Sequence, residues 1–186
     1  MAKVKLTANT ALYPVPVVLV SCCDEPDKKT NIITIAWCGI VCSNPPLISI
    51  SIRPSRHSHE IIKRSGNFVV NIPTEEILEK VDFCGNHSGS GIDKFQKCSF
   101  GKLPSSKISS PMIKECPVNI ECSLRQVIEL GAHNMFIGEV LAVHVDNELL
   151  DKEKNIDYKK AMPVVFNQGE YWSLGKKIGQ YGFSVK

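Results

Sequence analysis

The chain has 186 residues, which suits one domain with a full hydrophobic core, and 43% of them are hydrophobic and 22% charged, as in ordinary globular proteins. A formal net charge of +3, with both signs mixed along the chain, argues against a nucleic-acid-binding surface. The apolar run 15–20 is too short for a signal peptide, and no run reaches the roughly 20 apolar residues of a membrane span. We therefore expect a single cytoplasmic domain over residues 1–186, with no nucleic-acid or membrane partner.

Short apolar, β-branched runs separated by Asp, Asn, Lys and Pro turns predict a series of strands. In chain order these runs are 14–22, 30–37, 46–53, 67–73, 116–130, 132–146, 163–166 and 170–175. Leu130-Gly131 is expected to turn a long antiparallel hairpin, and 167–169 a tight one. About eight strands without βαβ alternation predict a mainly β fold, a closed antiparallel barrel with a few short flanking helices.

Helical patterns are few and short. Ser58 is a candidate N-cap for a helix that stops at Gly66. Thr74 is a candidate cap for a second helix whose apolar face includes Val81. Residues 89–97 are expected to form a glycine-rich loop that enters a helical turn. GxGxxG and GxxxxGK[ST] motifs are absent, which argues against the usual glycine-rich loops that bind dinucleotides and nucleoside triphosphates.

Eight cysteines in such a chain are expected to be reduced, and none forms a CxxC pair. Most are interpreted as small buried hydrophobic residues. "CGNH" offers two zinc ligands, Cys84 and His87, but no second pair stands at zinc-finger spacing, so no metal site is predicted. A zinc or thiol-redox protein that uses Cys84, His87, Cys98 and Cys116 remains the less favoured alternative.

The stretch 31–40, "NIITIAWCGI", begins as a strand, but neither face is cleanly polar and Gly39 interrupts it just after Trp37. The later loop "RPSRHS" gathers basic and hydroxyl side chains immediately before a helix: Arg53, Ser55, Arg56 and Ser58. Free N–H groups at a helix start, beside hydroxyls and guanidinium groups, form an anion site that suits a phosphate. The alternative is a solvated basic loop in which Ser58 is an ordinary cap.

Five motifs follow one another in a fixed order. They are Asn-x-x-Thr-x-Ala-Trp-x-Gly (31–39), Ser-Asn-Pro-Pro (43–46), Ser-Ile-Arg-Pro-Ser-Arg-x-Ser (51–58), Gly-Asn-Phe-Val-Val-Asn (66–71) and Asp-Lys-Phe (93–95). With this order the chain resembles the flavin reductase-like family, the FMN-binding split β-barrels, and within it the flavoredoxin type. The resemblance extends from Pro14 to Leu174.

The resemblance implies a homodimer with one non-covalently bound FMN per subunit. Electrons would pass from NADH or NADPH, or from a redox carrier protein, through FMN to an acceptor. The implied cofactor-binding residues are Asn31, Thr34, Ala36, Trp37, Cys38, Ser51, Ile52, Arg53, Ser58, Lys94, His133 and Phe166. His133 is also the candidate catalytic residue, as a polar neighbour of the substrate.

On this interpretation, Trp37 offers an aromatic surface to the isoalloxazine ring, and small side chains at Ala36, Cys38 and Gly39 let the backbone approach the ring's polar edge. Cys38 is interpreted as a packing residue rather than a redox-active thiol, because no resolving partner is evident. A flavin-binding storage or sensor module without fast turnover remains the alternative function.

Overall fold

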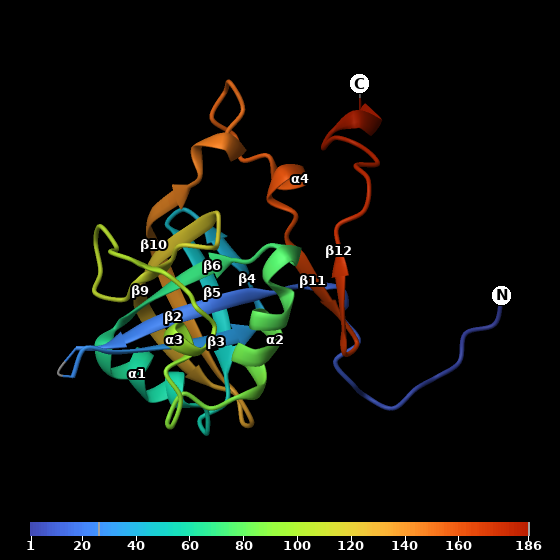
Figure 1. The fold of residues 1–186 in the computed structure, drawn as a ribbon. Helices are drawn as coiled ribbons and strands as arrows, with labels where there is room; N and C mark the ends of the chain where they lie inside the picture. Colours follow the sequence, from blue (N-terminus) through green and yellow to red (C-terminus); the bar gives the residue numbers. More distant parts are fainter. Residues whose placement is uncertain (26, 186) are drawn as a thin grey trace.

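A computed structural model describes residues 1–25 and 27–185 and is mainly β (Figure 1). The strands are β1 (Val15–Pro16), β2 (Val18–Asp24), β3 (Lys29–Ile35), β4 (Cys38–Ser43), β5 (Pro46–Ile52), β6 (Asn67–Ile72), β7 (Lys102–Leu103), β8 (Met112–Ile113), β9 (Val118–Glu129), β10 (Asn134–Val145), β11 (Val164–Asn167) and β12 (Glu170–Ser173). The α-helices are α1 (His57–Ser65), α2 (Leu78–Asn86), α3 (Lys94–Lys97) and α4 (Tyr158–Ala161). Three 3₁₀ turns complete the structure: η1 (Glu75–Ile77), η2 (Asn147–Leu149) and η3 (Phe183–Val185).

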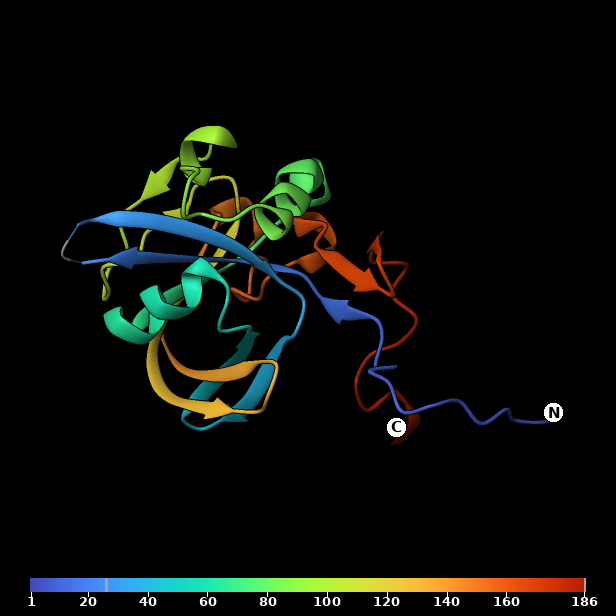
Figure 2. The same ribbon diagram turned by 90° about the horizontal axis from the view of Figure 1, so that it is seen from below.

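Seven strands form one antiparallel sheet in the order β3-β2-β6-β9-β10-β5-β4. The sheet is strongly curved, and Figure 2 shows the β4–β5 hairpin lying below the long β2–β3 hairpin. β1, β11 and β12 form a smaller sheet beside it. Over residues 1–25 and 27–185, no ladder joins β3 to β4, the two ends of the large sheet. Closure of the barrel therefore stays a prediction.

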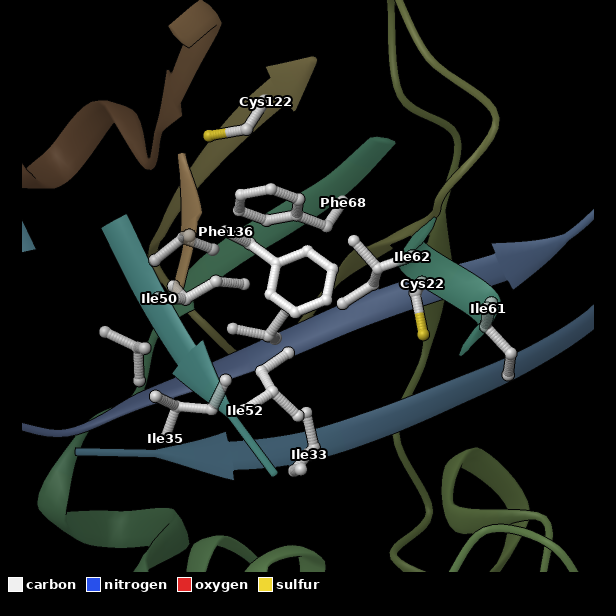
Figure 3. Close-up of a cluster of buried hydrophobic side chains, with 13 residues drawn as sticks. Cys22, Ile33, Ile35, Ile50, Ile52, Ile61, Ile62, Phe68, Cys122 and Phe136 are labelled. Carbon is white, nitrogen blue, oxygen red and sulfur yellow. The ribbon is translucent and has the colours of Figure 1, made fainter. Parts of the chain in front are cut away.

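The main core lies inside the curve of the large sheet. Figure 3 shows its fully buried side chains pointing toward one another, among them Ile50, Ile52, Phe68 and Phe136. α1 covers one end of this core with Ile62. Removing these side chains from water stabilises the fold by roughly 1.5–3 kcal/mol each.

A second apolar cluster covers the outer side of β2 and β3. Leu19 and Ile32 pack there against Val81 of α2 and Phe95 of α3. β2 is consequently buried on both faces, which explains why the sequence of this region lacks the alternation of a strand with one solvated side.

Most of the expected strands form, and both expected hairpins are present. Leu130 N–H donates to the His133 carbonyl (3.0 Å) where β9 turns into β10, and Gly131 has φ +92°. Gln168 and Gly169 have φ +48° and +96° in the turn between β11 and β12, as in two-residue hairpin loops. The second helix buries Val81, as expected, but the expected cap is wrong: Thr74 precedes the 3₁₀ turn η1 and makes no side-chain cap bond, and α2 begins at Leu78 with Ile77 in the N-cap position.

The expected break at Gly39 is wrong. Gly39 lies inside β4, paired with Ser49 of β5, and the chain leaves the ladder earlier, at Ala36 and Trp37. Sequence inspection missed β4 because Ile40 is 83% exposed and the small Cys38 side chain packs against the core, so the strand lacks an alternating pattern of large apolar residues. Its pairing with β5, rather than burial, makes it a strand.

Glu121 of β9 is fully buried and anchors the loop between β7 and β8. Its carboxylate accepts hydrogen bonds from the Ser106 N–H (2.7 Å) and hydroxyl (2.9 Å), from the Lys107 N–H (2.8 Å) and from His144 Nε2 (2.6 Å). Burial alone would raise the pKa of Glu121, but these hydrogen bonds outweigh it and hold the pKa below its usual value.

Because its pKa is lower in the folded state, ionised Glu121 stabilises the fold above the unfolded-state pKa, and this contribution disappears as pH falls through the folded-state pKa. We expect Glu121→Gln to lower the free energy of unfolding at pH 7 by about 2 kcal/mol. The difference from the unsubstituted protein should shrink below about pH 4. Urea unfolding across pH checks this, with Glu129→Gln, an exposed position on β9, as control. An equal pH dependence of both variants would contradict the assignment.

Candidate functional site

Two adjoining pockets open along β3. The polar pocket, a cavity of about 170 Å³, is lined chiefly by Asn31, Arg53, Ser55, Ser58, Gly89 and Lys94. The aromatic pocket, about 280 Å³, is lined by Thr34, Ala36, Trp37, Ser51, Ile52 and His133. Ile33, Arg53 and Arg56 line both cavities, so together they form one elongated site.

The start of α1 forms one wall of the polar pocket. Arg56 N–H donates to the Arg53 carbonyl (3.0 Å), and the turn so formed leads into the helix at His57. The expected N-cap, Ser58, is wrong, because Arg56 holds that position and makes no side-chain cap. Ser58 is buried within the first turn, where its hydroxyl accepts a hydrogen bond from Asn31 Nδ2 (2.8 Å). The helix start therefore leaves free N–H groups beside two arginines.

Asn31 carries an unpaired buried atom. Its Oδ1 is the one buried side-chain polar atom without a hydrogen-bond partner in the part of the chain that the structure describes. Gly89 lies directly against it, and a Cβ at that glycine would stand 2.0 Å from Oδ1. A buried carbonyl oxygen without a donor is unfavourable by about 1–3 kcal/mol, so a ligand hydroxyl in the pocket would satisfy it.

Lys94 lines the polar pocket and also fastens three elements together. Its side chain is 2% exposed, and Nζ donates to the carbonyls of Ile32 in β3 and Cys84 in α2, both at 2.8 Å. An ammonium group has three protons, so one remains for a ligand. Burial is the main cause that lowers the pKa of Lys94, and the nearby charge of Arg56 acts in the same direction.

The aromatic pocket contains a packed pair, Trp37 and His133. Their ring centroids are 4.5 Å apart at 49°, and Trp37 remains 39% exposed. Arg53 Nε donates to His133 Nε2 (3.3 Å), so that nitrogen is an acceptor and Nδ1 carries the ring proton. Burial, followed by the charge of Arg53, lowers the pKa of His133 and favours the neutral imidazole.

Two of the expected site residues lie outside these pockets. Phe166 of β11 borders a separate recess that also includes Thr34 and Ala36. Cys38 borders a groove beside residues 9–12 and packs against the main core, and burial raises the pKa of its thiol to about 12. This environment suits the packing role predicted for it. Sequence reasoning missed Gly89, whose only signal was its place in the glycine-rich loop.

Comparisons with known proteins identify the family. The sequence profile described as "Flavin reductase like domain" matches residues 10–175. The flavoredoxin of Desulfovibrio vulgaris (Miyazaki F) is 34% identical, covers 100% of both chains and superimposes with a TM-score of 0.93. The flavoredoxin from Methanosarcina acetivorans is 30% identical over 100% of both chains, with a TM-score of 0.91. A protein of Archaeoglobus fulgidus is 36% identical over 141 residues, 76% of this chain and 80% of its own.

The chain belongs to the flavin reductase-like family. The resemblance inferred from the five motifs is confirmed, and the chain is a flavin-binding oxidoreductase. The residues present fit a flavin: the aromatic pocket offers a flat apolar surface, and the unpaired Asn31 Oδ1 can accept from a ribityl hydroxyl.

Neither a metal centre nor a membrane helix emerges from the described residues of this flavin reductase-like protein. Across 1–25 and 27–185, no three His, Cys, Asp or Glu side chains are grouped to hold a metal ion. The His87 ring instead stacks on Phe83, with centroids 3.9 Å apart. No helix in those ranges has the length and apolar character needed to span a bilayer.

Proposed function

We propose that this protein binds FMN non-covalently and passes electrons from NADH, NADPH or a redox carrier protein through it to an acceptor. The observation that carries the proposal is the change along one elongated site from a polar end, which contains Asn31, Ser58 and Lys94, to an aromatic end with Trp37 and His133, while Arg53 and Arg56 line both ends. FMN likewise has a polar and an aromatic end, because its phosphate carries close to two negative charges at neutral pH and its ring is flat and largely apolar.

The chain's own residues would orient the cofactor and keep water away from it. Bound FMN supplies the redox chemistry, and no protein nucleophile is required. Trp37 offers a partly exposed ring as the apolar surface. His133 acts as the catalytic residue by donating its Nδ1 proton in a hydrogen bond to the substrate, because Arg53 Nε–H already occupies Nε2. Its lowered pKa keeps this imidazole neutral at pH 7.

The phosphate would dock in the polar pocket, between Arg53, the start of α1 and the remaining proton of Lys94. We expect FMN to bind more tightly than riboflavin, which has no phosphate. Arg53→Ala should weaken FMN binding roughly 10- to 150-fold, the equivalent of about 1.5–3 kcal/mol for a charge-assisted hydrogen bond. Its effect on riboflavin should be small.

Titration of both flavins, followed by absorbance and flavin fluorescence, checks this expectation. Arg125→Ala is the control, since Arg125 pairs with Glu139 on the surface and borders neither pocket. A protein that binds no FMN would overturn the proposal. Equal losses of both flavins in Arg53→Ala would mean that the phosphate lies elsewhere.

Turnover separates the proposed carrier from a storage or sensor module. If a nicotinamide is the electron donor, the FMN-loaded protein should oxidise NADH or NADPH over many turnovers. If the donor is a redox carrier protein, neither nicotinamide should support turnover. Bound FMN that is reduced by neither nicotinamide nor a reduced ferredoxin would favour the storage or sensor function.

We propose a homodimer for the same molecule. Two strands of the large sheet expose apolar side chains: Ile40 and Val41 on β4, and Leu141 and Val143 on β10. A second subunit would bury this apolar surface. Light scattering should then report about twice the chain mass of 20.6 kDa. A monomer mass with FMN bound would contradict this.

The remaining expectations are also proposals. We propose a closed split barrel, supported by the bond from Ser51 N–H to the Trp37 carbonyl (2.9 Å), which links the bend after β3 to β5. We propose one flavin reductase-like domain over residues 1–186, supported by the profile match to 10–175. A cytoplasmic location is proposed because all eight cysteines are free thiols, which suits a reducing compartment.

A further inference from the structure

Two buried cysteines from different helices touch behind the polar pocket. Cys84 lies in α2 and Cys98 directly follows α3, and their sulfur atoms are 3.8 Å apart although the residues are separated by 14 positions. Both side chains belong to the second apolar cluster, with Cys84 fully buried and Cys98 6% exposed. The electron-transfer function proposed above uses neither thiol.

The segment between these cysteines forms a wall of the polar pocket. It includes Gly89, which lies against Asn31, and Lys94, whose ammonium group donates to the Cys84 carbonyl. Cys98 N–H in turn donates to the Lys94 carbonyl (3.0 Å). A covalent bond between Cys84 and Cys98 would thus close a ring around the segment that carries Gly89 and Lys94.

We propose that Cys84 and Cys98 form a redox-modification site: a peroxide oxidises the pair to a disulfide, which fastens this pocket wall and slows cofactor exchange. The second half of the proposal rests on the FMN-binding function proposed above. Bringing the sulfur atoms from 3.8 Å to a disulfide length of about 2.05 Å requires a shift of less than ~2 Å between α2 and the end of α3.

The oxidation is a two-electron reaction with hydrogen peroxide. One sulfur attacks a peroxide oxygen, the O–O bond breaks, and a sulfenic acid and one water result. The second thiol sulfur attacks the sulfenic sulfur, the S–S bond forms, and a second water leaves. Both thiol protons and two electrons thereby pass to the peroxide.

Access controls the rate of this reaction. Burial raises the pKa of Cys84 to about 12, so the packed pair contains little thiolate and reacts slowly. Separation of the four-residue helix α3 from α2 exposes both sulfurs. A ligand that contacts Gly89 and Lys94 holds this segment closed, so bound FMN should protect the thiols, and the disulfide should in turn retain FMN.

The full-length protein tests the proposal in three measurements. The reduced, FMN-free chain is treated with hydrogen peroxide, and the disulfides are mapped by peptide mass spectrometry. We expect a Cys84–Cys98 crosslink that dithiothreitol reverses and that forms at least fivefold more slowly with FMN bound. FMN should also dissociate at least fivefold more slowly from the oxidised protein than from the reduced one.

Cys98→Ser should abolish both the crosslink and the peroxide effect on FMN dissociation. Cys116→Ser, the same substitution at another buried thiol of this apolar cluster, is the matched control and should keep both effects. Absence of the crosslink, a different pairing, or a crosslink with unchanged FMN dissociation would overturn the proposal. Disulfide mapping in the FMN-free chain tests the formation of the Cys84–Cys98 bond independently of FMN. A protein that binds no FMN would therefore count against the proposed function and not against this bond.

Discussion

Lys94→Met should lower the free energy of unfolding by about 2–4 kcal/mol. The substitution keeps an unbranched side chain that is one atom shorter but removes the ammonium group, so the buried carbonyls of Ile32 and Cys84 lose their donor. Burial disfavours the charged form of Lys94, so replacing it with an uncharged residue removes an unfavourable contribution. This gain offsets part of the lost stability. α3 should also detach more readily from β3 and α2.

Urea unfolding in the absence of flavin measures this effect, because no cofactor then contributes to stability. Lys97→Met is the matched control, since Lys97 is exposed on the same short helix. A loss confined to FMN binding, with unfolding unchanged, would mean that Lys94 serves the ligand and does not hold the elements together.

Gly89→Ala should weaken FMN binding roughly 5- to 150-fold, the equivalent of about 1–3 kcal/mol. The new Cβ would lie 2.0 Å from Asn31 Oδ1, so either the glycine-rich loop retreats or Asn31 abandons its bond to Ser58. Either movement reshapes the polar pocket at Asn31 Oδ1, which has no hydrogen-bond partner among residues 1–25 and 27–185.

Gly91→Ala provides the comparison, because no atom lies within 4 Å of a Cβ at that position of the same loop. Both substitutions lower the conformational entropy of the unfolded chain by a similar amount. The difference in FMN affinity between the two variants therefore reports the contact with Asn31. Fluorescence titration with FMN measures both. Equal affinities of the two variants would show that the close approach of the loop to Asn31 is irrelevant to the ligand.

Local patterns in the sequence predicted the parts of the fold that depend on neighbouring residues. Alternating apolar runs and the turn at Gly131 gave the long β9–β10 hairpin. The order of the motifs gave the family, and with it residues that the structure gathers along β3.

Long-range contacts explain what the sequence did not predict. Ser58 fits the pattern of a helix cap, but its hydroxyl is engaged by Asn31, 27 positions away. Lys94 was expected to contact the cofactor, and its ammonium group also donates to two backbone carbonyls, those of Ile32 and Cys84. None of these three partners can be inferred from residues adjacent in sequence, because the contacts exist only after β3, α1, α2 and α3 have packed together.

The double burial of β2 affects how its alignment with neighbouring strands is chosen. In a sheet with one solvated face, sliding a strand by one residue exposes apolar side chains, and that penalty fixes the alignment. β2 is buried on both faces, so much of this penalty is absent. Hydrogen bonds of buried polar groups fix the alignment instead. Ser21 donates to the Pro111 carbonyl (2.5 Å) and accepts from Asn71 Nδ2 (3.0 Å). A strand shifted by one residue would leave these groups without hydrogen-bond partners in the protein interior, so two polar side chains, Ser21 and Asn71, specify the alignment of a strand that is buried on both faces.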